Sequence, residues 1–265
     1  MTVGLLLTAV VPMVLFAGSL LVGEWQRNRD ELLLRLDANA TLNASVIDDF
    51  LEGQLAGVRL LADQMGDDPN LRGEELARLL HIYPSMLRVH QVDANGGVVA
   101  VRDARGRTLP PLAGLVAGEA WFQAMRGGSG AAVSDVYRRR AYGNEVVVGV
   151  SAPLLRDGHF AGALQAEIPV QAFTRLSAES LARRGLELAL LDAGNRVVHA
   201  GPALRWKALA GAGAEGQAVR RIAAAPRRTQ RVLLMDGLLR EGGKAYVDAV
   251  GMRNGWTLVL VASRG

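Results

Sequence analysis

The feature that most restricts the fold of this chain is a turn between strands that occurs twice. The stretch QVDANGGVVAV surrounds Asp93 and the stretch LLDAGNRVVHA surrounds Asp192, 99 residues farther along. A later turn, Arg-Asp-Gly at 156–158, has its counterpart in Arg-Asn-Gly at 253–255, at an offset of 97 residues. Two landmarks at nearly one spacing indicate that a single structural unit is used twice. Both aspartates are expected to accept hydrogen bonds from the backbone of their own turns.

Both halves are predicted to contain a short helix, a hairpin and a middle segment, followed by a longer antiparallel pair of strands in the first half and by three strands in the second. In the first half these are 70–83, 86–103, 119–127 with an extended segment at 134–137, and 144–170; in the second they are 176–184, 186–200, 201–230 and 231–263. The glycine-rich stretch 211–216 spells a dinucleotide-binding pattern, but no strand leads into it. It is therefore interpreted as a flexible loop, preceded by a helical stretch at 206–210.

The N-terminus carries an uncharged run over residues 3–23, long enough for a helix that crosses a bilayer of about 30 Å. Trp25 follows where an interfacial aromatic residue is expected. A cleaved signal peptide is the alternative, but it normally has a basic segment before the run and a cleavage motif after it. Neither is present, so the sequence predicts an uncleaved anchor at 1–23. The arginines that follow favour a cytoplasmic body by the positive-inside rule: Arg27, Arg29 and Arg35.

A long amphipathic helix is predicted after the anchor, over residues 24–66. Its apolar positions recur at steps of three and four on one stripe: Leu33, Leu36, Ala40, Ala44, Ile47, Leu51, Leu55, Val58, Ala62 and Met65. The sequence Gly66-Asp67-Asp68-Pro69 predicts its end. Such a stripe packs along a globular core, and near the membrane it could also form the seam of a homodimer.

Several classes of function are disfavoured by composition. The chain has no cysteine, and its net charge of +4 is small for 265 residues, with no large basic cluster to suggest nucleic-acid binding. The four histidines are scattered, without the spacing of a metal site, and no serine stands in a nucleophile elbow. No kinase transmitter, GGDEF or methyl-accepting segment is present. The sequence therefore predicts no enzyme, no cofactor and no metal within this chain.

Taken in order, several segments resemble the double Cache sensor domains of bacterial transmembrane receptors: the anchor, the long helix, VDANGGVV, WFQAM, VSDVY, EVVVGVSAPLLRDGHFAGALQAEI and the closing GWTLVLVA. The resemblance implies an α+β fold with two tandem PAS-like modules and antiparallel sheets. It divides the chain into a transmembrane anchor at 1–23, a stalk helix at 24–66, a membrane-distal ligand-binding module at 67–175 and a membrane-proximal module at 176–265. It also implies a location outside the bacterial inner membrane, and this outweighs the arginine distribution.

In the amino-acid-binding branch of that family, an Arg lies two residues before a Trp-aromatic pair and grips the ligand carboxylate. A strand Tyr lines the pocket, and an Asp holds the ammonium group. Here Trp121 and Phe122 match the aromatic pair and Tyr137 the strand Tyr, but Glu119 replaces the Arg and Glu167 the Asp. The lost Arg removes a bidentate clamp for a carboxylate, so the resemblance favours an amine or other small metabolite.

Alternatives stay open for these residues and for the function. Arg126 and Arg138–Arg140 lie near enough in sequence to offer contacts to an anion instead. Trp121 and Phe122 fit equally well as core residues, and Glu119 as a solvated charge at a helix start. The leading hypothesis is the sensory region of a signalling receptor of the histidine kinase, diguanylate cyclase or chemoreceptor type. The alternative is an anchored periplasmic binding or scaffold protein without signalling output.

Overall fold

The computed structural model describes the backbone of residues 2–65, 69–110, 116–140, 142–226 and 232–263, and in its first helix the side chains are described without a break from Asp30 to Met65. Residues 2–23 of the predicted anchor belong to this helix, but the side chains of the anchor lie outside the described set. Among the residues that the structure describes, no helix is both long and apolar enough to span a bilayer. The anchor stays a prediction.

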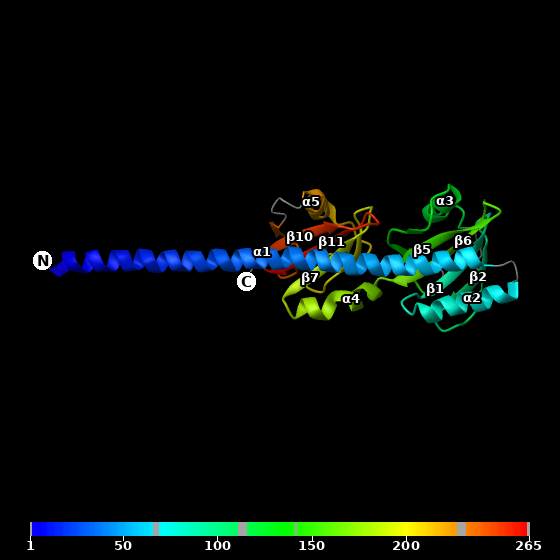
Figure 1. The fold of residues 1–265 in the computed structure, drawn as a ribbon, viewed down its shortest axis with the longest axis horizontal. Helices are drawn as coiled ribbons and strands as arrows, with labels where there is room; N and C mark the ends of the chain where they lie inside the picture. The colour runs from blue at the N-terminus through cyan, green and yellow to red at the C-terminus, as the bar shows by residue number, and fades with distance from the viewer. Residues whose placement is uncertain (1, 66–68, 111–115, 141, 227–231, 264–265) are drawn as a thin grey trace.

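One helix, α1 (Thr2–Gln64), runs along both globular parts of the molecule, and its N-terminal part projects beyond them (Figure 1). The predicted apolar stripe is confirmed where it meets the sheets, because its central positions are buried: Leu36, Ala40, Ala44, Ile47, Leu51, Val58 and Ala62. Steps of three and four keep these side chains on one side of the helix, where they join a single apolar core shared by both halves.

The first module follows α1 and extends from Pro69 to Pro169. Its elements are α2 (Pro69–Ile82), β1 (Arg88–Asp93), β2 (Val98–Asp103), α3 (Ala120–Arg126), β3 (Ala132–Val133), β4 (Tyr137–Arg139), β5 (Glu145–Arg156) and β6 (His159–Pro169). The second module extends from Gln171 to Ser263. Its elements are α4 (Gln171–Ala182), β7 (Leu186–Leu191), β8 (Val197–Ala200), α5 (Gly213–Ala224), β9 (Leu233–Asp236), β10 (Lys244–Gly251) and β11 (Thr257–Ser263).

The two sheets have the same strand order, which confirms that one arrangement is built twice. In the first module the order is β2-β1-β6-β5-β3, with β4 also paired to β5; in the second it is β8-β7-β11-β10-β9. All pairings are antiparallel. The first hairpin of each module thus lies beside its last strand, as β1 beside β6 and β7 beside β11.

Helices cover both faces of each sheet. In the first module α1 and α2 pack on one face and α3 on the other; in the second α1 and α4 pack on one face and α5 on the other (Figure 1). The apolar core under α1 is continuous through both modules, whereas the faces under α3 and α5 have separate small cores. The face under α3 is therefore a compartment of its own, and the candidate site lies there.

The aspartate turns follow the sequence prediction, whereas the middle segment of the second module differs from it. Asp93 accepts hydrogen bonds from the backbone of its own turn at 2.8 Å, and Asp192 does the same, as expected. The predicted loop over 211–216 is wrong in part because α5 begins at Gly213, and 206–210 is not helical. Propensity is weak there, and the packing of Val219 and Ile222 on the second sheet stabilises the helix.

Candidate ligand-binding site

The sheet face under α3 differs in chemistry from the equivalent face under α5. Strand pairing aligns each cross-strand row of the first module with a row of the second. His90, Gln165 and Ser151 form one row, and its counterpart is Ala189, Val259 and Ala249. The next row holds Arg88, Glu167 and Gly149, where the second module has Glu187, Val261 and Val247. Buried polar groups are costly, so this concentration in one module marks a candidate functional site.

Glu167 is the centre of the polar rows and is fully buried. Its Oε2 accepts a hydrogen bond from Arg88 Nε at 2.9 Å, and its Oε1 accepts one from Arg139 Nε. His90 Nε2 lies 3.1 Å from the same Oε1. Both oxygens of the carboxylate are thus occupied by side chains of this chain, which offsets the cost of burying its charge.

The two arginines have further partners that hold them in place. Arg88 reaches Glu145 Oε2 and the carbonyl of Tyr142, each at 2.8 Å. Arg139 donates to Gln165 Oε1 at 2.9 Å and to the Tyr137 hydroxyl at 3.1 Å, and its guanidinium lies 5.0 Å from the centre of the Tyr137 ring. The ring of Tyr137 thus makes a cation–π contact with a guanidinium of the protein itself.

The charges of this cluster shift the protonation equilibria of its members. Burial would raise the pKa of Glu167, but His90, Arg139 and Arg88 outweigh it and lower that pKa to about 2. Burial and the charge of Glu167 raise the pKa of Tyr137 well above its ordinary value. At neutral pH the site therefore contains an ionised Glu167 and a neutral Tyr137 hydroxyl.

An open cleft of about 590 Å³ lies in front of this cluster. It is lined by Glu119, Ala120, Trp121, Ser134, Asp135, Tyr137, Arg138, Arg139, Arg140 and Arg196. Glu119 precedes α3, and its carboxylate accepts a hydrogen bond from Trp121 Nε1 at 2.6 Å and faces Arg139 at 3.4 Å. The indole is thereby held over the cleft by a residue of its own segment.

The structure brings together most of the residues that the sequence singled out. Glu119, Trp121 and Tyr137 line the cleft, and Glu167 lies buried behind it in contact with Arg139. Phe122 is fully buried in the core below α3, where its ring packs edge-on against Phe160, and it does not line the cleft. For Phe122 the core interpretation holds. Whether the other four contact a ligand stays a prediction.

Sequence reasoning missed the partners of Glu167. Arg88 and His90 stand two residues apart on β1, and Gln165 and Glu167 stand two residues apart on β6. Polar residues at alternate positions of apolar strands lie on one sheet face, so this pattern was a usable signal. The pairing of Arg88 with Glu167 across the sheet required the strand register.

Besides His90 Nε2, whose 3.1 Å contact with Glu167 lacks hydrogen-bond geometry, two buried polar atoms on this face have no hydrogen-bond partner among the described residues, Ser151 Oγ and Gln165 Nε2. Both side chains are 1% exposed. Unsatisfied buried polar groups cost about 1–3 kcal/mol each, so they are uncommon without a functional reason. Within the same described part of the chain, no group of three histidine or acidic side chains could hold a metal ion.

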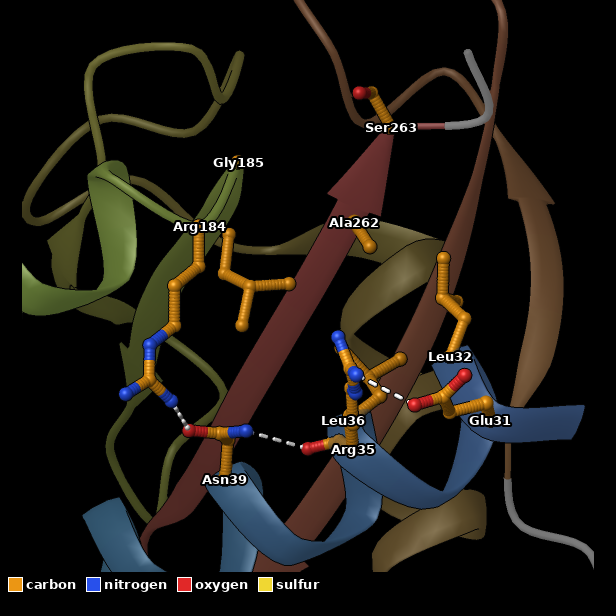
Figure 2. A pocket seen from close by; sticks show the side chains of 10 residues that line it. Glu31, Leu32, Arg35, Leu36, Asn39, Arg184, Gly185, Ala262 and Ser263 are labelled. Carbon is orange, nitrogen blue, oxygen red and sulfur yellow. Dashed lines mark hydrogen bonds and ion pairs between the residues drawn. The ribbon is translucent and has the colours of Figure 1, made fainter. Parts of the chain in front are cut away.

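A larger hollow of about 840 Å³ lies between α1 and the ends of β7 and β11, away from this cluster (Figure 2). Arg184 donates to Asn39 Oδ1 at 3.2 Å across it, and Asn39 donates to the carbonyl of Arg35 at 2.6 Å. It is a groove where Leu36 of α1 lies near Ala262 at the end of the last strand. This position suits the transmission of a conformational change between α1 and β11 better than the binding of a ligand.

No family model matches the chain, and no curated protein matches it significantly. Its fold is that of the ligand-binding domains of bacterial chemoreceptors, the double Cache fold. The domain of Campylobacter jejuni Tlp3 in complex with L-valine aligns with a TM-score of 0.67 and 16% identity, over 89% of this chain and 94% of that one.

Two further solved domains show the same likeness. That of Pseudomonas aeruginosa PctB in complex with L-Arg has a TM-score of 0.66 and 16% identity, over 88% of each chain. That of Pseudomonas fluorescens CtaA in complex with L-alanine has a TM-score of 0.66 and 14% identity, over 88% of this chain and 97% of that one. The predicted fold class is thus confirmed for the two modules and the long helix.

Proposed function

We propose that this chain is the extracytoplasmic sensory region of a bacterial inner-membrane receptor that binds a small molecule in the first module. The single observation that carries this proposal is the difference between the two modules: five of the six residues in these rows are polar in the first module, whereas in the second only Glu187 is polar. The fold supports it, since Tlp3, PctB and CtaA are chemoreceptors whose domains were solved with amino acids bound. Residues 1–23 would anchor the chain, with 24–265 in the periplasm.

The long helix offers a route for the signal. Its C-terminal part packs on β5 and β6 of the first module, while its residues from Leu32 to Asn39 line the groove beside the end of β11. Arg253, in the turn between β10 and β11, pairs with Asp49 and Glu52 of α1. A ligand that shifts the first module against α1 would move the helix relative to the last strand.

A homodimer fits the exposed side of α1. Leu34, Leu42, Val46 and Leu60 are exposed there to between 40% and 73%. Exposed apolar side chains on the side of a helix that faces away from the core are a surface that a second copy could cover. Dimerisation would let small shifts of two helices act on each other close to the membrane.

The class of ligand can be inferred from the charged side chains of the site that already have partners within the protein. Glu167 is fully engaged by Arg88 and Arg139, and Glu119 contacts Trp121 and Arg139. An amine ligand would have to compete with Arg139 for both carboxylates. This competition weakens the amine hypothesis drawn from the resemblance. A ligand that contacts the exposed side chains of the cleft is favoured instead.

A thermal-shift screen of the purified chain against amino acids, amines, organic acids and neutral solutes tests binding. Trp121→Ala should abolish the ligand-induced shift while keeping the far-UV circular dichroism of the wild type. A matched control is Trp206→Ala, in the second module and away from the cleft. Loss of binding in both variants, or in neither, would contradict a site in the first module.

Signalling and simple binding are separated by a distance measurement. The chain has no cysteine, so spin labels at Leu34→Cys and Ser263→Cys report the distance between α1 and the end of β11 without background. A ligand-induced change supports the receptor hypothesis. Binding with an unchanged distance distribution would favour the alternative, an anchored binding or scaffold protein without output.

A further inference from the structure

The two modules meet through a reciprocal pair of carboxylates beside the cleft. Asp135, between β3 and β4 of the first module, accepts a hydrogen bond from the backbone N–H of Ala193 at 3.1 Å. Asp192, in the β7–β8 turn of the second module, accepts one from the backbone N–H of Val136 at 3.2 Å. Each carboxylate thus satisfies an amide of the other module, and we call this pair the clasp.

The second module holds its side of the clasp firmly. Asp192 is fully buried and also accepts from the backbone of Arg196 at 2.8 Å. Arg220 of α5 donates to the carbonyls of Asp192 and Ala193, the latter at 2.9 Å. The β7–β8 turn is therefore tied both to its own hairpin and to the helix above it, and it presents a rigid surface to the first module.

Arg196 brings the second module into the cleft itself. Its Nε lies 3.2 Å from Asp192 Oδ2 and its NH2 group 3.9 Å from Asp135 Oδ2, which places the guanidinium beside the clasp. The side chain is 42% exposed and lines the cleft together with residues of the first module. The site is consequently shared by both modules.

Positive charge dominates the exposed side of this cleft. Its lining includes three arginines that are not buried, Arg138, Arg140 and Arg196, besides the buried Arg139 that pairs with Glu167. The two acidic residues of the lining, Glu119 and Asp135, already accept hydrogen bonds. Arg138 donates to the carbonyl of Asn144 at 3.0 Å, a neutral partner, and Arg140 is exposed with no ion pair among the described residues. Arg138 and Arg140 thus have guanidinium groups free of carboxylate partners among the described residues, which suits them to oxyanions. Arg196 pairs with Asp192 and Asp135, but its side chain is 42% exposed and remains open to the cleft.

We propose that the cleft binds a small anionic molecule whose carboxylate or phosphate group is held between Arg138 and Arg140 of the first module and Arg196 of the second. The indole of Trp121 offers a flat apolar wall for the rest of the molecule. The bound anion ties the two modules together beside the clasp, so the second module takes part in recognition. This inference rests on the proposed function and specifies its ligand class.

Isothermal titration of the full chain with succinate, citrate, glycerol 3-phosphate, putrescine and L-alanine tests it. At least one anion should bind saturably, with affinity falling as salt increases. Arg196→Gln should weaken that anion about tenfold or more, because it removes a charge-assisted contact. Arg221→Gln, an exposed arginine on α5 outside the cleft, should leave the Kd within about twofold.

Arg196 also contacts Asp192, so a folding effect must be separated from a binding effect. Arg196→Lys keeps the positive charge and should retain affinity better than Arg196→Gln, and Arg138→Gln should weaken binding without touching the clasp. Equal affinity in Arg196→Gln and Arg221→Gln would refute the role of the second module. If putrescine or L-alanine binds and no anion does, the ligand class is wrong while the proposed function stands. If none of the five binds, this inference is refuted, and the broader screen decides the proposed function.

Discussion

Replacing Glu167 by Gln removes the negative charge that balances two buried guanidinium groups while keeping the size of the side chain. Arg88 and Arg139 are only 3% and 6% exposed, so the charge that remains is poorly solvated. Breaking a buried ion pair by removing one partner costs about 3–5 kcal/mol. The lowering of the Glu167 pKa from 4.5 to about 2 corresponds to about 3 kcal/mol, which agrees with the lower end of that range of costs.

We therefore expect Glu167→Gln to lower the free energy of unfolding by about 3 kcal/mol at pH 7. For a chain of this size that is a fall in Tm of roughly 6–12 °C. Urea unfolding measures the loss of unfolding free energy. Hydrogen exchange that is faster in β1 and β6 but unchanged in β7 and β11 shows that the loss arises in the first module. Glu145→Gln is the control, because Glu145 also pairs with Arg88 but is 35% exposed, and it should cost under about 1 kcal/mol.

The same pair gives a pH dependence with a defined sign. In the folded chain Glu167 stays ionised down to about pH 2, whereas in the unfolded chain it takes up a proton near pH 4.5. Its contribution is fully present above about pH 4.5 and is lost as the pH falls toward 2. The difference between wild type and Glu167→Gln should shrink over that window. A Glu167→Gln cost no larger than that of Glu145→Gln, or a difference independent of pH, would refute the buried-pair reasoning.

Four other substitutions test the fold. Gly162→Ala should destabilise the chain by roughly 2–3 kcal/mol, because φ is +147° there and a Cβ would collide with a carbonyl of β1. Gly53→Ala, on the open face of α1, should stabilise the chain by about 0.5–1 kcal/mol. Thermal melting measures both effects. Trp256→Ala should cost about 3–5 kcal/mol in urea unfolding, since the indole is 1% exposed in the shared core, and a loss under 1 kcal/mol would contradict that packing. Arg253→Ala should speed hydrogen exchange in the β10–β11 turn while leaving exchange in the first module unchanged.

The architecture was largely predictable because its signals are local. The matching turns at Asp93 and Asp192 indicated the repeat, and the apolar steps from Leu36 to Ala62 indicated which side of α1 is buried. Turn chemistry and hydrophobic periodicity act within a few residues, so sequence alone expresses them. Helix α5 was missed for the opposite reason: its two glycines, Gly213 and Gly216, disfavour a helix, and only packing on the second sheet stabilises it.

The candidate site was predictable only in part. Trp121, Tyr137 and Glu119 were named from their order along the chain, and they do meet in one cleft. Their order carries no information on charge balance. On account of Glu119 and Glu167 the resemblance favoured an amine or other small metabolite, but it gave no sign that both carboxylates contact Arg139 of the same chain.

What the sequence by itself determined is the repeated unit, the long helix and the residue types available to a site in the first module. Only the tertiary structure decided how those residues are used. The register of β1 against β6 pairs Arg88 with Glu167, and the docking of the β7–β8 turn brings Arg196 of the second module to the first. Turns and helix faces depend on neighbours in the chain, whereas burial and ion pairing depend on segments that meet only after folding, when water no longer screens their charges.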